Sequence, residues 1–228
     1  IRDVAVTGVQ TCALPIYGAL PYDWDATTGL ARRFIPGQPG GQHTLTGLAH
    51  DKASHVAYDP EINEQSIHAR SLKLAALQKT LKAPPLFGDK SGDLLIVGWG
   101  STKGTIEEAV ELMRAEGCKV SSMHLRFLQP LPPGIGEAMK RFKQVMTIEG
   151  NWSDRPEDEI IDENNRRYSA LAILLRSRYL VDVDCWSEVK GAPIKPSTIC
   201  DVIRGKLKPA AKAAAKPAKA KQAKAKKS

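Results

Sequence analysis

The chain has 228 residues, of which 42% are hydrophobic and 25% are charged, and its formal net charge is +8. This composition is typical of a globular protein and excludes a wholly disordered one, and every apolar run is shorter than the roughly 18 residues of a membrane span. The length suits one or two domains. A charge of +8 would suit a nucleic-acid-binding protein, so the position of the charge decides what it means.

The excess of positive charge lies at the end of the chain. Residues 206–228 contain nine lysines and no acidic residue, whereas residues 1–205 carry 24 basic and 25 acidic side chains. Alanine, lysine and proline dominate this tail, so we expect a disordered segment with nothing to bury. Such a tail is usually a solvated appendage, and its alternative role is salt-sensitive, sequence-independent binding of nucleic acid or acidic partners.

The first sixteen residues do not resemble native coding sequence. All eleven residues of Val6–Ile16 (VTGVQTCALPI) match the translation of a common short-read sequencing adapter. We therefore expect residues 1–16 to be a read-through artefact and native coding to begin near Tyr17, and we exclude this segment from fold reasoning. The alternative is a genuine strand with alternating valines.

Three cysteines remain outside that segment, at wide spacing and without a CxxC pair. Cys118, Cys185 and Cys200 therefore offer no zinc or cluster motif. The simplest interpretation is buried free thiols in a reducing compartment, so we expect a cytoplasmic protein.

The histidines give weak signals. His50 and Asp51 could form an oriented imidazole–carboxylate pair. His50 and His55 lack a third ligand at metal spacing, so we predict no metal site. Ser101 lies in no GxSxG nucleophile elbow.

Residues 17–91 are expected to contain an irregular segment followed by one helix. Residues 17–48 are rich in Gly, Pro and Thr, and their turn signals indicate the surface of a larger domain. Apolar spacing over Asp59–Leu81 predicts a helix that ends before Pro84 and Pro85. Gly88–Gly92 then forms a short linker.

From residue 92 onward, strand and helix patterns alternate. We expect strands at Asp93–Gly100, Lys119–Leu125, Gln144–Glu149 and Leu180–Cys185, and helices at Thr105–Glu116, Ile135–Phe142, Tyr168–Tyr179 and Pro196–Leu207. Thr105 and Glu108 have capping-box spacing at the first of these helices. The alternation predicts an α/β domain over residues 92–205, with a mostly parallel sheet and helices on both faces.

Two segments at strand ends could carry function. Gly98, Gly100 and Ser101 lie in a glycine-rich turn, which could contact an anion or partner, or simply let the helix pack close to the strand. Its spacing fits neither a Walker loop nor GxGxxG. Glu149 and Asn151 follow the third strand, where they could orient a partner or substrate, or form a turn with a capping Asn.

Several motifs together resemble one family. Arg33 and Pro36–Gly37 match an Arg-x-x-Pro-Gly motif, and His50–Asp51 match a Glu-His-Asp motif in which Ala49 replaces the glutamate. With the helix that follows, this stretch resembles the end of the pyrimidine-binding domain of 2-oxoacid:ferredoxin oxidoreductase α subunits.

The rest of the chain is similar to the transketolase C-terminal-like domain that follows in this family. The matching stretches are Leu95–Gly104, Glu107–Val110, Leu125–Pro130, Glu149–Asn151 and Gly191–Pro193. The resemblance covers residues 17–205. It implies an α/β domain over 92–205, preceded by a remnant of a thiamine-pyrimidine-binding α/β domain over 17–91.

The resemblance implies a C-terminal fragment of an α subunit of 2-oxoglutarate synthase type. The intact enzyme would oxidatively decarboxylate a 2-oxoacid on thiamine diphosphate and Mg, with CoA as co-substrate. Electrons would pass through a 4Fe-4S cluster on the partner β subunit to ferredoxin. We expect a hetero-oligomer with no membrane association and, at most, non-specific contact of the tail with nucleic acid.

The family's upstream motifs near the thiamine ring and the substrate have no match here. The resemblance therefore assigns no catalytic, cofactor-binding or metal-binding residue, and we expect the fragment alone to bind no cofactor and to be inactive. The residues left as loop or interface candidates are Arg33, His50, Gly98, Gly100, Ser101, Glu149 and Asn151. The chain departs from the family where the charged stretch Ser153–Arg167 separates Glu-x-Asn from the next helix.

Two alternatives remain open at this point. One is a transketolase C-terminal-like domain of another thiamine enzyme, against which the Arg33–His50 segment argues. The other is a nucleic-acid-binding protein that uses its basic tail.

Overall fold

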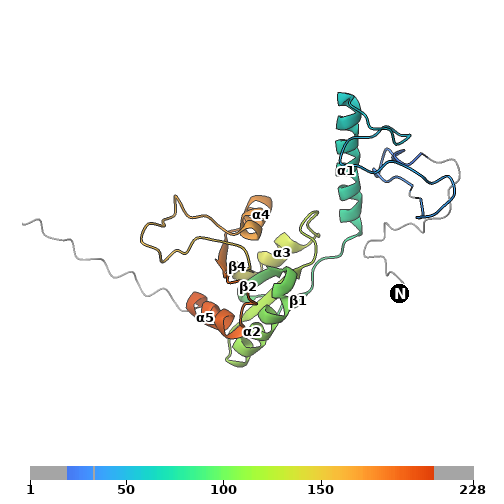
Figure 1. The fold of residues 1–228 in the computed structure, drawn as a ribbon. Coiled ribbons are helices and arrows are strands. Elements are labelled where there is room, and N and C mark those ends of the chain that lie inside the picture. The colour runs from blue at the N-terminus through green and yellow to red at the C-terminus, as the bar shows by residue number, and fades with distance from the viewer. Residues whose placement is uncertain (1–19, 33, 208–228) are drawn as a thin grey trace, which may run out of the picture.

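The computed structural model describes residues 20–32 and 34–207. The expectations for residues 1–16, for Arg33 and for the tail after Leu207 lie outside these described residues. Figure 1 shows two parts, an irregular amino-terminal segment beside a long helix and an α/β domain that contains the sheet.

The helix predicted over Asp59–Leu81 is confirmed as α1 (Pro60–Thr80). The amino-terminal segment packs against this helix. Asp59 caps this helix, because its carboxylate accepts the backbone N–H groups of residues 61 and 62 at 2.9 and 3.2 Å. Gly29 has a φ of +66°, and a Cβ there would lie 2.0 Å from the carbonyl oxygen of Ala69. Only glycine therefore permits this close approach of the segment to α1.

The α/β domain is built on a five-stranded sheet. Its spatial order is β1 (Leu86–Phe87), β3 (Val120–Leu125), β2 (Gly92–Trp99), β4 (Phe142–Glu149) and β5 (Val183–Ser187). Strand β1 is antiparallel to β3, and every other neighbouring pair is parallel. The four predicted strands are confirmed within three residues at their ends. Strand β1 was missed because two residues are too short to show a period.

Helices cover both faces of this sheet. The helical elements are η1 (Gly100–Thr102), α2 (Lys103–Ala115), α3 (Ile135–Met139), α4 (Ala170–Tyr179) and α5 (Pro196–Leu207). Buried side chains of α2 and α5 share one hydrophobic cluster, and those of α3 and α4 share the other. The predicted class, a mostly parallel α/β sheet with helices on both faces, is confirmed.

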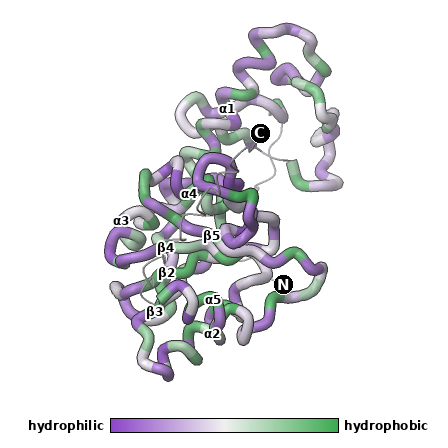
Figure 2. The backbone as a smooth tube through the Cα atoms, turned by 90° about the vertical axis from the view of Figure 1, so that its left-hand side faces the viewer, coloured by the Kyte–Doolittle hydropathy of each residue, from purple (hydrophilic) through white to green (hydrophobic). Residues whose placement is uncertain are grey.

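Alternation along β2 explains the two clusters. Leu94 and Ile96 belong to the α2–α5 cluster and Leu95 and Val97 to the α3–α4 cluster, and all four side chains are 0% exposed. In Figure 2, hydrophobic residues recur along the strands between the helices. Each such buried side chain contributes about 1.5–3 kcal/mol relative to exposure, so this strand anchors the domain.

Two local expectations were wrong. Helix α2 begins at Lys103 rather than Thr105, and the hydroxyl of Thr105 donates to the carbonyl oxygen of Thr102 at 3.0 Å instead of forming a capping box. Helix α3 ends at Met139 because Phe142 already starts β4. Within residues 20–32 and 34–207, no helix is long and apolar enough to cross a membrane.

Candidate functional site

The carboxyl ends of the parallel strands meet at one edge of the sheet. Val97 of β2 pairs with Thr147 of β4, which places Trp99 and Glu149 on adjacent strand ends. Glu149 in turn pairs with Ser187 at the end of β5. Ligand sites of α/β proteins occupy this kind of edge, so its side chains are the first candidates for a functional site.

Glu149 is the central polar residue of this edge. Its side chain is 0% exposed. One carboxylate oxygen, Oε2, accepts the indole N–H of Trp99 at 3.2 Å and the backbone N–H of Leu171 at 3.0 Å. The other, Oε1, accepts the hydroxyl of Ser169 and the backbone N–H of Ala172, the latter at 3.3 Å. The carboxylate therefore joins β2, β4 and the start of α4.

These contacts use the anion-binding capacity of α4. Leu171 and Ala172 lie in the first turn of α4, where backbone N–H groups have no intrahelical acceptor and the helix dipole favours negative charge. Glu149 supplies that charge from within the chain. The geometry therefore supports a structural role for Glu149, with no carboxylate oxygen left to face a substrate.

Asn151 lies two residues beyond Glu149 and is half-buried. Among the described residues its side-chain Oδ1 is buried without a hydrogen-bond partner. The cap of the following helix is formed by Glu149 and not by this asparagine. Asn151 therefore keeps an unused acceptor near the sheet edge.

The glycine-rich turn packs tightly against α2. A Cβ at Gly98 would lie 2.4 Å from Cδ1 of Ile106 and 2.8 Å from the hydroxyl of Thr102. Gly100 has a φ of +61°, which turns the chain into η1. Ser101 is exposed at the surface of that turn. The close packing of strand and helix accounts for Gly98, and the exposed part of the turn is Gly100 and Ser101.

His50 is remote from this edge and belongs to the amino-terminal segment. It is 4% exposed, its ring stacks on that of Tyr22 with centroids 4.7 Å apart, and its Nε2 lies 3.1 Å from the hydroxyl of Thr46. The expected His50–Asp51 pair does not form. Asp51 instead lies 3.0 Å from Nδ1 of His55, and hydrogen bonds from His55 hold the pKa of Asp51 below its ordinary value.

The charged stretch after β4 forms a long loop, and an ion pair between Asp154 and Arg167 joins its two ends. Asp154 accepts Nε, Nη2 and the backbone N–H of Arg167 at 2.8–2.9 Å, and also the indole N–H of Trp152 at 3.1 Å. These bonds, chiefly those from Arg167, hold the pKa of Asp154 far below its ordinary value. These bonds join the start of the loop to its end.

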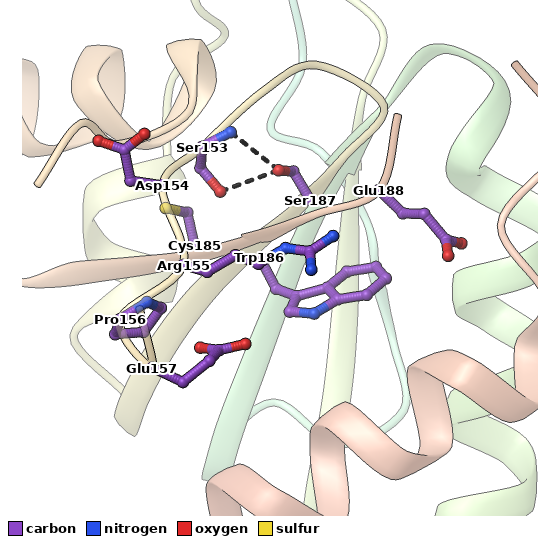
Figure 3. A pocket seen from close by; sticks show the side chains of 9 residues that line it. All are labelled: Ser153, Asp154, Arg155, Pro156, Glu157, Cys185, Trp186, Ser187 and Glu188. Atoms are coloured by element: carbon purple, nitrogen blue, oxygen red, sulfur yellow. Dashed lines mark hydrogen bonds between the residues drawn. The ribbon is translucent and has the colours of Figure 1, made fainter. Parts of the chain in front are cut away.

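A hollow of about 230 Å³ lies between this loop and β5, and we call it the β5 hollow. Its lining residues come from two segments, Ser153–Glu157 of the loop and Cys185–Glu188 of β5 and its end (Figure 3). Ser187 accepts the backbone N–H of Ser153 at 2.9 Å, which fixes the two walls to each other.

Ser169, Asp154 and Trp99 were not predicted from the sequence as site residues. Ser169 precedes an apolar helix, which is an N-cap signal that could have identified it. Asp154 and Trp99 carry no such signal because their partners lie 13 and 50 residues away.

The described residues offer no place for a metal ion. No group of three or more His, Cys, Asp or Glu side chains in residues 20–32 and 34–207 could hold one. Cys185 belongs to the α3–α4 cluster and Cys200 to the α2–α5 cluster, so these two thiols lie on opposite faces of the sheet. The resemblance assigns no metal-binding residue to this chain, and no reaction step is assigned to these residues.

The sheet, its helices and the polar edge define an α/β domain with a mostly parallel sheet and helices on both faces. Residues 92–175 match the sequence profile of the pyruvate:ferredoxin oxidoreductase core domain II. The chain is 35% identical over 203 residues, or 87% of its length, to the 2-oxoglutarate oxidoreductase subunit KorA of Mycobacterium tuberculosis. The chain belongs to the 2-oxoacid:ferredoxin oxidoreductase family and corresponds to part of an α subunit.

Other comparisons agree with this assignment. The α subunit of 2-oxoacid:ferredoxin oxidoreductase 1 from Aeropyrum pernix is 30% identical over 164 residues, covering 63% of this chain and 26% of that protein. A 2-oxoglutarate:ferredoxin oxidoreductase structure from Magnetococcus marinus matches 81% of this chain and 30% of its own chain, with a TM-score of 0.62 and 24% identity, and supports the fold. The chain spans 28% of the length of the M. tuberculosis relative.

Proposed function

We propose that this chain is the carboxyl-terminal part of the α subunit of a cytoplasmic 2-oxoglutarate:ferredoxin oxidoreductase. The intact enzyme would oxidatively decarboxylate 2-oxoglutarate, releasing CO2 and passing the acyl group to CoA, with thiamine diphosphate and Mg in the active site. Its electrons would pass through a 4Fe-4S cluster on the β subunit to ferredoxin. In this proposal the chain supplies packing between parts of the enzyme, and the reacting groups belong to other segments.

One observation carries the proposal. The similarity to the M. tuberculosis 2-oxoglutarate oxidoreductase subunit extends over 87% of the chain, so it includes residues on both sides of the boundary between α1 and the sheet domain. A shared domain of another thiamine enzyme would be expected to match the sheet domain alone. The alternative, a nucleic-acid-binding protein, would need a basic surface. Residues 1–205 carry 24 basic and 25 acidic side chains, so their net charge does not support it.

The geometry of the sheet edge agrees with a packing role. The buried carboxylate of Glu149 accepts hydrogen bonds from Trp99 and from the start of α4. Gly100 and Ser101 form an exposed turn at the same edge, with Asn151 close behind the end of β4. Rigid strand ends that support an exposed polar turn can present a fixed surface to a partner, and Gly100, Ser101 and Asn151 are the residues we assign to it.

Assembly and turnover test the proposal separately. The chain would be mixed with the β subunit of the M. tuberculosis-type enzyme and, in parallel, fused to the upstream part of its α subunit before mixing. We expect turnover only from the fusion with β, measured as CoA-dependent reduction of a viologen dye by 2-oxoglutarate. Pyruvate and 2-oxoisovalerate serve as substrate controls and should give much slower reduction.

Three outcomes would contradict parts of the proposal. Turnover by the unfused chain with β would show that the chain carries reacting groups. A fusion that assembles with β but prefers pyruvate would overturn the assignment of 2-oxoglutarate. An Asn151→Ala fusion that assembles as tightly as its parent would remove Asn151 from the proposed surface.

A further inference from the structure

The loop that forms one wall of the β5 hollow is strongly acidic. Residues 154–163 contain six carboxylates and one basic side chain, Arg155. Asp154 is paired with Arg167, whereas none of the carboxylates of residues 157–163 forms an ion pair within the part of the chain that the structure describes. Residues 157–160 are all exposed, and Ile160 among them is 83% exposed. This acidic loop therefore presents carboxylates without an ion-pair partner in the described part of the chain, together with some apolar surface.

The hollow itself combines apolar, acidic and basic groups. Trp186 and Pro156 supply apolar surface, Glu157 and Glu188 supply carboxylates, and the guanidinium of Arg155 lies beside Trp186 (Figure 3). Glu188 is already paired with Lys190. The long alkyl chain of a lysine can pack on an indole while its ammonium group reaches carboxylates, so the hollow suits a lysine-rich peptide.

One carboxylate brings the end of α5 next to the acidic loop. Asp184 on β5 lies 2.6 Å from Nζ of Lys206, in the last turn of α5, and 2.9 Å from Nη2 of Arg166, at the end of the loop. Leu207 and Trp186 also pack against the same hydrophobic cluster. The chain therefore leaves α5 beside the β5 hollow.

The chain that follows has the complementary charge. Residues 208–228 contain eight lysines and no acidic residue. At about 3.3 Å per extended residue, even the first five of these residues span roughly 16 Å. A short tether keeps the local concentration of these lysines in the millimolar range, which offsets the weakness of each exposed ion pair.

We propose that residues 208–228 dock in the same chain on the β5 hollow and the acidic loop. Lysine side chains pack on Trp186 and direct their ammonium groups to Glu157 and the carboxylates after it. Docking neutralises the tail and the loop together. The lysines of the tail are then largely withdrawn from nucleic acid and from acidic partners, which must compete with the loop for them.

Carbodiimide cross-linking of the full chain tests this docking. An equimolar mixture of ¹⁴N- and ¹⁵N-labelled chains would be cross-linked at low salt and digested, and the Lys–Glu and Lys–Asp links located by mass spectrometry. We expect links between residues 208–228 and residues 157–163 within single chains, at least threefold more frequent than links to Glu108 and Glu111 on α2. The links should be lost at about 0.5 M NaCl, where screening removes exposed ion pairs.

A pair of matched variants separates docking from general attraction. Glu157→Gln with Glu159→Gln removes two loop charges, and Glu108→Gln with Glu111→Gln removes two exposed charges on α2. The double variant in the loop should raise the rate of acetylation of the tail lysines at least twofold. The double variant on α2 should leave this rate unchanged. Links found mainly between chains of different label, links distributed equally over α2, or equal acetylation in both variants would each overturn the proposal. Near-ultraviolet circular dichroism checks that both variants are folded.

Discussion

Glu149 accepts the indole N–H of Trp99 at 3.2 Å, and this hydrogen bond joins the ends of β2 and β4. The same carboxylate caps α4 from outside the helix. It is fully buried, and no cation contacts it among the described residues, so N–H and O–H donors and the helix dipole must stabilise its charge. The sheet edge therefore depends on one acidic side chain for its order.

Replacing Glu149 with glutamine should destabilise the domain strongly. Both carboxylate oxygens of Glu149 accept hydrogen bonds. In glutamine an NH₂ group replaces one of these oxygens, so at least one of the N–H or O–H groups that now donate to Glu149 would lose its acceptor and stay buried and unpaired. We expect a loss of about 2–3 kcal/mol in the free energy of unfolding, measured by urea titration. The exposed substitution Glu108→Gln is the control and should change it by less than about 0.5 kcal/mol. Equal stability of the two variants would show that Glu149 does not stabilise this edge.

The fold was largely predictable because its signals are local. Strand β2 is a near-continuous apolar run, as expected for a strand buried on both faces, and helix α5 was predicted with its observed bounds, Pro196–Leu207. The errors occur where tertiary packing sets the limits. Helix α2 begins earlier than its capping signal indicates because η1 leads directly into it.

The site was less predictable because its contacts are distant in sequence. Glu149 was recognised as a candidate at a strand end, but its partners Trp99 and Ser169 lie 50 and 20 residues away. The adjacency of His50 and Asp51 suggested a pair, yet the backbone bridge from His50 to Val56 brings His55 to Asp51 instead. Sequence neighbours on an extended backbone point to opposite sides, which explains this error.

Two glycines on either side of the turn between β2 and α2 should respond oppositely to alanine. A Cβ at Gly98 would collide with Ile106, whereas a Cβ at Gly104, in the first turn of α2, meets nothing within 4 Å. We expect Gly98→Ala to lower the free energy of unfolding by about 1–3 kcal/mol. Gly104→Ala should raise it by up to about 1 kcal/mol because alanine favours helix. Adding Ile106→Val, which removes the clashing methyl, should recover part of the first loss. Urea midpoints measure all three, and a neutral Gly98→Ala would contradict the packing role of Gly98.

The Asp154–Arg167 pair should make stability depend on pH in the acid range. The pKa of Asp154 is lowered in the folded chain by its bonds to Arg167, so the stabilisation is complete above its unfolded value of about 3.9 and is lost as the pH falls toward the folded pKa. Asp154→Asn should therefore be less stable than the parent at neutral pH, with the difference narrowing between about pH 5 and pH 2. Asp158→Asn, in the same loop and without such a partner, is the control. Urea titrations across this pH range would contradict the assignment if the difference stayed constant.

Gly29 should determine whether the amino-terminal segment stays on α1. Alanine at this position would adopt an unfavourable φ of +66° and place its Cβ 2.0 Å from the carbonyl oxygen of Ala69. We expect Gly29→Ala to release residues 20–58 from the helix while the sheet domain stays folded. Limited proteolysis should then cleave this segment at least tenfold faster, with the urea midpoint of the sheet domain unchanged. Gly47→Ala is the matched control, since a Cβ there meets nothing within 4 Å. Equal cleavage of the two variants would show that the contact at Gly29 does not hold the segment in place.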